Sequence, residues 1–506
     1  MQWITRLPFF VVLMGLGAIA MLLPAAHGAV VEDFTTMRVF FYGFILFSVL
    51  TLLIALTMSG YAPVNIARSQ LTGLLAAFSV LPLMFAVPFF EAVGNTSFLD
   101  AWFEMVSSFT TTGATVYAGG ADLTPSQHLW RSTVGWLGGL LVWITAVSIF
   151  APMNLGGFEV RATAAVGRGA TGSFTQIGGV ADPSERLVRY TMALTPVYAG
   201  LTAVLWIGLV MLGERPYIAL AHAMAVLSTS GITPIGGLYF AASGFLGEVL
   251  IFAFFVFALS RLTFSRGLSG ERNQRLWRDP EFTTALVLIG LATAALFLRH
   301  FVGTTDAQTA FSPPDMLIAF WGTLFTVTSF LTTTGFESQF WGAATDWSRL
   351  STPGLFLIGL ALIGGGVATT AGGVKLLRIY ALFRHLEREQ ERLLSPSSVG
   401  GGGRDARRIR RQGAYISWVF FMLFAISIAA VMVLLSLTGV PFETAMVLTV
   451  AALSTTGPLA VVAAETPIFY ADLPEAAKMV LAGAMVLGRL ETLAIIALFN
   501  PEIWQR

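Results

Sequence analysis

The chain has 506 residues, of which 56% are hydrophobic and only 11% are charged. This composition lies outside the range of ordinary soluble domains and indicates an integral membrane protein, and apolar stretches recurring from end to end favour one polytopic domain. The net charge of +1 gives no sign of a nucleic-acid partner, and the lack of cysteine excludes disulfides and thiolate metal sites.

The N-terminal stretch carries Arg6, an apolar core and small residues at 26–29. A secretory signal peptide has the same arrangement. The apolar sequence continues, however, after a short polar break at Glu32 and Asp33. We therefore favour a first membrane span over a cleaved leader.

Ten segments are close to the length of about 20 mainly apolar residues that a spanning helix needs. They lie near 8–26, 38–58, 69–92, 128–152, 188–212, 246–264, 282–302, 353–380, 414–437 and 474–499. Within each of the last four pairs is a shorter apolar stretch, near 98–110, 216–228, 314–332 and 441–454. Helix-initiating residues begin these stretches: Asn95, Thr96 and Ser97; Pro216; Pro313 and Pro314 behind Ser312; and Pro441. We predict that they are re-entrant half-helices.

Each predicted half-helix ends in a run of hydroxyl residues and a glycine. The endings are TTTG at Gly113, STSG at Gly231, TTTG at Gly335 and STTG at Gly457, spaced by 118, 104 and 122 residues. One such ending is ordinary helix capping, but four at similar intervals indicate an internal repeat. The sequence predicts a leading two-helix unit, 1–62, and four pore repeats, 63–153, 187–266, 280–380 and 413–506.

The placement of basic residues predicts the orientation of the chain in the membrane. Of the 29 Lys and Arg residues, 22 fall on one side of the predicted spans. That side should be cytoplasmic, with both termini inside and the half-helices entering from outside. Segment 381–412 should be a solvated cytoplasmic linker, and the alternative for its basic end, 404–411, is contact with anionic lipid or a cytoplasmic partner.

Irregular backbone at membrane depth is tolerated only where protein buries it or where it lines a water-filled cavity. Four glycine loops therefore predict a shared axial cavity, in which main-chain carbonyls replace the hydration shell of a cation. Glycine permits the positive φ that such a loop needs. Half-helices entering from outside also point their partially negative ends at the centre. Oxygen ligands without a carboxylate cluster favour a monovalent ion over Ca²⁺ or Mg²⁺.

Several motifs resemble one family. They are FTTTGATV at 109–116, GWLGG at 135–139, WRDPEF at 277–282, IGGGVATTAGGVKLLRI at 363–379 and LGRLETLAIIAL at 487–498. The chain is similar over essentially its whole length to the potassium transporter superfamily of bacterial Trk and Ktr membrane subunits and plant high-affinity transporters, and above all to the Trk type. The resemblance implies an all-α protein of the bacterial inner membrane, with two leading helices and four linked membrane–pore-helix–membrane units around a pseudo-fourfold pore.

The resemblance also assigns a selectivity filter, with K⁺ bound at these residues alone. Its members are Thr111, Thr112, Gly113, Thr229, Ser230, Gly231, Thr333, Thr334, Gly335, Thr455, Thr456 and Gly457. In the plant branch a serine at the first filter glycine accompanies sodium transport, so Gly113 favours potassium. The second loop departs from the expected pattern, since Gly236 or Gly237 competes with Gly231 for the filter position.

A gate below the filter is implied by the same resemblance. Its candidate residues are Gly364, Gly365, Gly366, Thr369, Thr370, Gly372, Gly373, Lys375 and Arg489. The alternative for the glycines is close helix packing. Arg489 should face the pore, because a cation at membrane depth is costly elsewhere. Glu491 is either its partner or paired with a neighbouring helix, and Glu104 and Glu443 either brace the filter or attract cations.

We therefore expect a potassium uptake subunit that conducts K⁺ inward. The alternative is a Na⁺/K⁺ or H⁺-coupled secondary transporter, which also shows broken helices and repeats. Enzyme motifs such as HExxH or a nucleophile elbow are absent from the sequence. We expect no cofactor, and the resemblance implies a homodimer and a separate cytoplasmic nucleotide-binding regulatory subunit of the TrkA kind.

Overall fold

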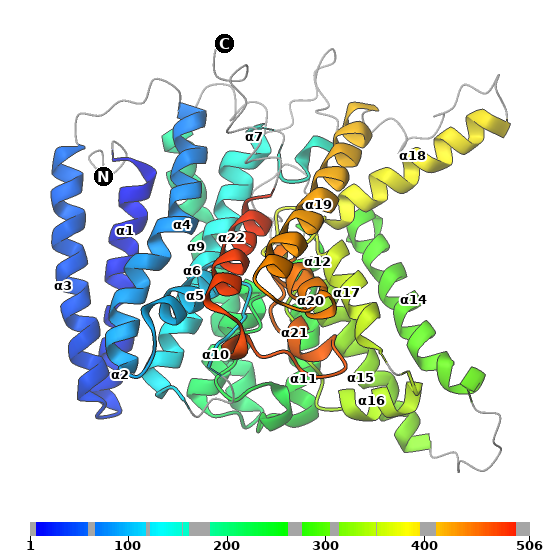
Figure 1. The fold of residues 1–506 in the computed structure, drawn as a ribbon, viewed down its shortest axis with the longest axis horizontal. Coiled ribbons are helices and arrows are strands. Elements are labelled where there is room, and N and C mark those ends of the chain that lie inside the picture. The colour runs from blue at the N-terminus through cyan, green and yellow to red at the C-terminus, as the bar shows by residue number, and fades with distance from the viewer. Residues whose placement is uncertain are drawn as a thin grey trace.

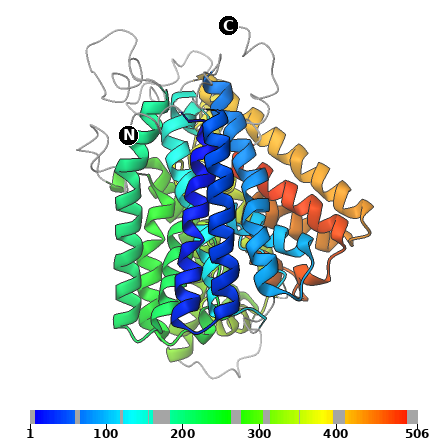
Figure 2. The ribbon, with the colours of Figure 1, turned by 90° about the vertical axis from the view of Figure 1, so that its left-hand side faces the viewer.

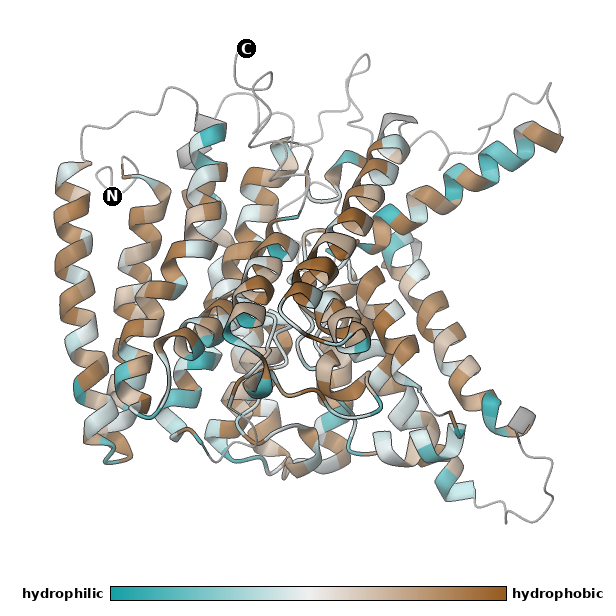
Figure 3. Cartoon of the chain, viewed as in Figure 1, coloured by the Kyte–Doolittle hydropathy of each residue, from teal (hydrophilic) through white to brown (hydrophobic). Residues whose placement is uncertain are grey.

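The computed structural model describes residues 7–58, 66–117, 122–153, 155–160, 183–261, 276–303, 313–350, 352–394 and 411–491. This part of the chain is helical and contains no strand. The helices form one bundle, and Figure 3 shows hydrophobic residues along most of them. Eight of the described helices are long and apolar enough to cross a membrane.

The leading helices lie together at one edge of the bundle (Figures 1 and 2). α1 (Phe9–Ala20) and α2 (Leu22–Val30) make a single span interrupted at Met21. α3 (Phe34–Thr57) begins after Asp33, whose Oδ1 accepts the backbone N–H of Thr36 at 3.1 Å. Capping by Asp33 lets the chain reverse, so that α3 packs on both α1 and α2.

Four helix sets follow, each with a long helix, a half-helix, a glycine loop and a further helix. Set 1 has α4 (Ile66–Val93), α5 (Phe98–Phe109) and α6 (Pro125–Thr145), and α6 continues through a π-helical turn, Ala146–Phe150, into α7 (Ala151–Met153). Set 2 has α9 (Pro183–Met211), α10 (Pro216–Ser228), α11 (Gly244–Phe254) and α12 (Val256–Leu259).

Set 3 has α14 (Pro280–Gly303), α15 (Pro313–Leu331), α16 (Trp341–Ser348), α17 (Gly354–Ile363) and α18 (Leu376–Leu394). Set 4 has α19 (Arg411–Leu437), α20 (Phe442–Leu453), α21 (Leu459–Val462) and α22 (Glu475–Leu490). Short 3-10 turns occur at Phe158–Val160, Leu238–Phe240, Leu276–Arg278 and Tyr470–Asp472. Helix α18 extends away from the bundle and is rich in polar residues (Figures 1 and 3).

Within the described residues, the observed spans differ from the predicted ones in three places. The third half-helix, α15, has 19 residues and is itself long enough to cross. Predicted span 353–380 is interrupted by a glycine loop at 364–375, and span 246–264 holds the short helices α11 and α12. Predicted span 474–499 is described only as far as residue 491. Apolar length alone therefore neither finds the interruptions inside two segments nor separates the half-helix α15 from a span.

The half-helices begin where the caps predict. Ser97 Oγ accepts the backbone N–H of Asp100 at 3.0 Å at the start of α5. Pro216 is the first residue of α10, where its missing N–H is harmless, and Pro441 directly precedes α20. Each half-helix packs against the long helix that precedes it in its set.

The helix sets close into a ring. In each set one of the later helices packs between the half-helix of its own set and that of the next. Helix α6 contacts α5 and α10, α11 contacts α10 and α15, α17 contacts α15 and α20, and α22 contacts α20 and α5. An ion pair of 2.7 Å between Lys478 Nζ and Asp100 Oδ1 joins the last set to the first. The four half-helices therefore surround one centre.

Candidate ion pathway

The four glycine loops share one backbone geometry. The residue two before each glycine is a threonine with left-handed φ, at 55° for Thr111, 54° for Thr229, 56° for Thr333 and 54° for Thr455. The next residue donates its N–H five residues back, at 2.8 Å in the first loop, 2.9 Å in the second and third, and 2.8 Å in the fourth. A left-handed residue with such a bond is how a helix C-terminus is capped. The threonines therefore turn the chain sharply at the end of each half-helix.

Hydroxyl pairs brace the loops from behind. The hydroxyl residue three before each glycine bonds the residue just before the glycine: Thr110–Thr112 at 2.8 Å, Ser228–Ser230 at 3.0 Å, Thr332–Thr334 at 3.0 Å and Ser454–Thr456 at 3.2 Å. These hydroxyl pairs hold each loop to the end of its own half-helix.

The glycine that ends each TTTG, STSG or STTG run touches the next loop around the ring. A Cβ on Gly113 would collide with the carbonyl oxygen of Ser230, and one on Gly231 with that of Thr334. A Cβ on Gly335 would meet Pro458 at 2.9 Å, and one on Gly457 would collide with the backbone of Ala114. The sequence of contacts thus runs through the four loops and returns to the first.

The fourth loop differs from the other three. Gly113, Gly231 and Gly335 have φ of 72°, 62° and 79°, but Gly457 has no positive φ. Pro458 follows it, and a residue before proline is driven toward extended backbone. The N–H of Gly457 also donates to the Thr112 carbonyl at 2.6 Å. The expectation that every filter glycine needs positive φ is therefore wrong for Gly457.

A bracing side chain lies nine residues before each of the first three glycines, and for Glu104 this is one of the two roles expected from the sequence. Glu104 Oε2 accepts the N–H of Val116 at 3.0 Å, and Thr326 Oγ1 accepts the N–H of Ser338 at 3.2 Å. His222 Nε2 bonds Thr233 Oγ1 at 3.1 Å. These contacts hold the chain leaving each loop, and the constant offset from the glycine is the signal that could have identified them.

The fourth set braces its loop from elsewhere. Leu448 stands at the equivalent position, and the Tyr470 hydroxyl instead donates to the Gly457 carbonyl at 3.0 Å. Glu443 is exposed in the first turn of α20 and makes no filter contact. Glu104 pairs with Arg131 at 2.6 Å between Oε1 and Nη2, and both side chains are buried.

A cavity of about 320 Å³ is lined by all four loops. Its lining includes Gly113, Gly231, Gly335 and Gly457 together. Gly236 and Gly237 also line this cavity, but a Cβ on either would meet open space. Gly231 thus has the ring contact that the other filter glycines make, and Gly236 and Gly237 do not.

A second glycine-rich segment of set 3, the 364–375 loop between α17 and α18, packs against the half-helix ends, and residues 364–378 are all buried. The N–H of Gly372 donates to Thr333 Oγ1 at 2.8 Å, and Thr370 Oγ1 donates to the Leu227 carbonyl at 3.0 Å. A Cβ on Gly372 would collide with the Ser454 carbonyl oxygen. The loop therefore contacts the half-helix ends of sets 2, 3 and 4 at once.

The other members of this loop serve its own shape. Gly364 and Gly373 lie so close that a Cβ on either would collide with the backbone of the other. Gly365 lies against the Ala258 carbonyl and Gly366 against that of Leu259. Thr369 Oγ1 donates to the Gly366 carbonyl at 2.7 Å, and Lys375 Nζ donates to the Ala371 carbonyl. Lys375 has a left-handed φ of 86°, an unfavourable conformation for a residue with a side chain.

Arg489 lies in the last turn of α22 and is buried. Its Nε and Nη2 have no hydrogen-bond partner among the described residues. Tyr198 of α9 and Glu491 are its electrostatic neighbours. An unpaired guanidinium at this depth is costly unless it faces water.

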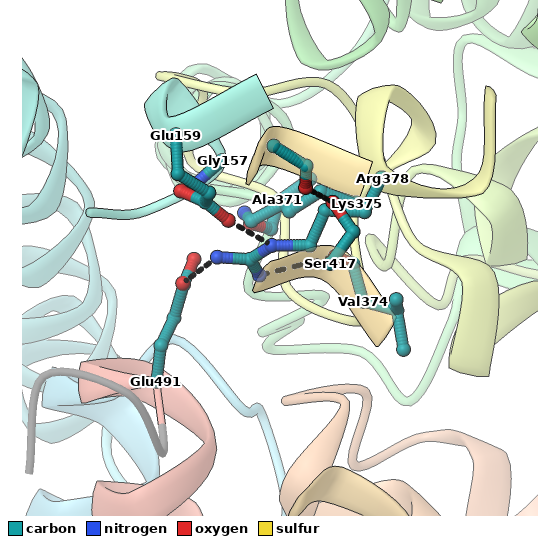
Figure 4. A network of polar contacts seen from close by, with 9 residues as sticks. Gly157, Glu159, Ala371, Val374, Lys375, Arg378, Ser417 and Glu491 are labelled. Atoms are coloured by element: carbon teal, nitrogen blue, oxygen red, sulfur yellow. Dashed lines mark hydrogen bonds and ion pairs between the residues drawn. The ribbon is translucent and has the colours of Figure 1, made fainter. Parts of the chain in front are cut away.

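Glu491 pairs with Arg378 rather than with Arg489. Arg378 is fully buried at the start of α18, where Nη2 lies 2.7 Å from Glu491 Oε2 and Nε lies 2.7 Å from Glu159 Oε1. Figure 4 shows Arg378 between the two carboxylates. Its guanidinium also lies 3.7 Å from the ring centroid of Phe420. This node, which the sequence did not predict, joins sets 1, 3 and 4.

The fold and this arrangement define a polytopic, all-helical membrane protein whose glycine loops converge on a buried centre. A family model described as TrkH, cation transport protein, matches residues 245–506, just over half of the chain. The chain is 30% identical over 468 residues to the Trk system potassium uptake protein TrkH of Halomonas elongata, which covers 88% of this chain and 89% of that protein. The chain therefore belongs to the TrkH family.

Two further likenesses agree with this membership. The Trk system potassium uptake protein TrkH of Vibrio parahaemolyticus is 29% identical over 446 residues, or 85% of this chain and 84% of that protein. The crystal structure of the potassium transporter TrkH from Vibrio parahaemolyticus matches all of both chains with a TM-score of 0.81 at 24% identity, and so has the same fold. The family and the all-helical membrane fold expected from the sequence are confirmed.

Proposed function

We propose that this chain is the membrane subunit of a Trk-type potassium uptake system and conducts K⁺ inward through the ring of glycine loops. The relatives of similar length carry the name of potassium uptake proteins. The observation that carries the proposal is the cyclic contact of Gly113, Gly231, Gly335 and Gly457, each against the next loop. Such a ring directs main-chain carbonyls at one axis, which is how a dehydrated K⁺ is coordinated.

The proposed filter consists of the three residues that end each loop, at 111–113, 229–231, 333–335 and 455–457. K⁺ is the transported ion, and the proposal needs neither a cofactor nor a chemical step. The membrane potential supplies about 2.3 kcal/mol per charge per 100 mV for inward movement. The four helix sets are proposed to be repeats with the boundaries predicted above, with both termini cytoplasmic.

The proposed gate is the 364–375 loop together with Arg489. The loop contacts three half-helix ends, and its left-handed Lys375 and Ala368 are the kind of strained residues that a switching element contains. Arg489 adds a buried positive charge, with Nε and Nη2 free of partners among the described residues, and we propose that this charge opposes cation passage. The proposal also includes a homodimer and a cytoplasmic nucleotide-binding regulator of the TrkA kind, both of which rest on the family resemblance.

Reversal potentials of the purified protein in bilayers, under opposed K⁺ and Na⁺ gradients, test the function. We expect a K⁺-selective potential in the parent and loss of K⁺ preference in Gly113→Ser, since the added side chain would collide with the Ser230 carbonyl. The matched control is Gly236→Ser, where a Cβ meets open space. A potential that shifts with pH instead of K⁺ would favour H⁺-coupled transport, and unchanged selectivity in Gly113→Ser would contradict the filter.

A further inference from the structure

The cavity lined by the four loops contains a carboxylate that the filter does not use. Glu337 lies two residues after Gly335 and lines the same cavity as the four filter glycines. The corresponding residues of the other loops are Thr115, Thr233 and Leu459. Within the described part of the chain Glu337 is the acidic residue that lines this cavity. The cavity therefore has a negative group on one side only.

The backbone that carries Glu337 is held firmly. Glu248 of α11 accepts the N–H of Gln339 at 2.5 Å, the hydroxyl of Ser338 at 2.8 Å and the indole N–H of Trp321 at 2.9 Å. These bonds use the Glu248 carboxylate fully. Glu337 makes no hydrogen bond or ion pair with any residue that the structure describes, so its carboxylate remains available to an occupant of the cavity.

The neighbouring charges do not neutralise Glu337. Arg131 also lines the cavity, but its guanidinium pairs with Glu104 at 2.6 Å and bonds His128 Nδ1 at 3.1 Å. The imidazole of His128, which Arg131 contacts, and the phenols of Tyr117 and Tyr470 are the other ionisable groups of the lining. Burial raises the pKa of both tyrosines, which keeps them neutral. A cation in the cavity would therefore find one uncompensated carboxylate.

The size of the cavity fits a hydrated ion. At ~30 Å³ per water molecule, 320 Å³ holds about ten waters. That is room for a monovalent cation with its first hydration shell, so the ion need not lose water before it reaches the glycine ring. We propose that Glu337 and the cavity it faces form an outer binding site for a hydrated monovalent cation, from which the ion enters the filter.

External pH should act on this site. Burial raises the pKa of Glu337 to about 7. The carboxylate is then charged above that pH and neutral below it, so cation binding should strengthen as the external pH rises through about 7. Bound K⁺ would favour the charged form and lower the apparent midpoint, which makes protons and K⁺ competitors.

The inference rests on the proposed function, and K⁺ uptake into liposomes tests both. At about pH 8, where the carboxylate is charged, we expect Glu337→Gln to raise the half-saturating K⁺ concentration about three- to tenfold. The maximal rate and the K⁺ preference should stay unchanged, because the filter is intact. Glu337→Asp should lie between the two. The matched control is Glu443→Gln, which removes an exposed carboxylate from α20 that does not line the cavity.

The pH profile provides a readout that a merely structural role would not move. The half-saturating concentration of the parent should fall between about pH 6 and about pH 8. That of Glu337→Gln should change much less, and any dependence left in it reports His128, which lines the same cavity. If the parent carries K⁺ and Glu337→Gln matches it in half-saturation and in pH profile, the outer site is overturned while the function stands. If the parent carries no K⁺, the proposed function fails and the site fails with it.

Discussion

At the scale of single residues, Glu104 has both structural and charge-balancing contacts. It holds the backbone of Val116 behind the first filter loop and pairs with Arg131, both side chains being buried. Removing one partner of a buried ion pair typically costs about 3–5 kcal/mol, because the other charge is left unpaired. We expect Glu104→Gln to lower the thermal unfolding temperature in detergent clearly, and Glu104→Gln with Arg131→Met to recover part of the loss. Equal stability of Glu104→Gln and the parent would contradict this role.

Arg489 is the second residue whose effect can be stated in advance. Its charge lacks a hydrogen-bond partner at two of its nitrogens within the described chain. A unit charge several ångströms from the ion path changes the barrier by about 1–2 kcal/mol at the effective dielectric of a partly hydrated site. Arg489→Ala should therefore raise K⁺ flux about tenfold, while Arg489→Lys, which keeps the charge, should stay near the parent. Unchanged flux in a stably folded Arg489→Ala protein would remove this residue from the gate.

At the scale of elements, the 364–375 loop is packed too tightly to accept a side chain at Gly372. A Cβ on Gly372 would collide with the Ser454 carbonyl and the Thr455 hydroxyl. Overpacking of this kind costs about 1–3 kcal/mol, and here the cost falls on the arrangement in which the loop contacts the half-helix ends. Gly372→Ala should displace the loop and raise basal K⁺ flux about five- to 150-fold. Gly359→Ala in α17 is the control, because its Cβ meets nothing within 4 Å. Flux at the parent level in both variants would show that the loop does not block the path.

The elements also show what the sequence predicts and what it does not. Ser97 and Pro216 start their helices through local chemistry, so these helix starts can be predicted from the sequence. The four loops at Gly113, Gly231, Gly335 and Gly457 can be predicted because the same ending occurs four times. The helix break after Ile363 is harder to predict, since the apolar length of 353–380 suggests an unbroken span. Gly457 departs from its counterparts because of Pro458, a local rule that outweighs the repeat.

At the scale of the whole molecule, the contacts that join helix sets lie beyond sequence reasoning. Arg378 meets Glu159 across 219 residues and Glu491 across 113. Neither pairing has a local signal, since each depends on how three helix sets pack around the ring. Spacing along one helix could exclude Arg489 as the partner of Glu491 but could not name Arg378. The family resemblance predicts a ring of four units. The contacts of Arg378 that join three helix sets can be found only in the folded structure.

The last prediction concerns this shared node. Arg378→Met would leave two buried carboxylates without their partner, a loss that typically costs about 3–5 kcal/mol. We expect a lower unfolding temperature and, because Arg378 follows directly after the glycine loop, higher basal K⁺ flux. Arg378→Lys should be intermediate, since an ammonium cannot reproduce the two-armed contact of a guanidinium. The control on the same helix is Arg384→Met, which breaks the exposed Arg384–Glu387 pair at 2.8 Å and should cost at most about 1 kcal/mol. If Arg378→Met and Arg384→Met have the same unfolding temperature and the same basal K⁺ flux, the node neither joins the helix sets nor restrains the 364–375 loop.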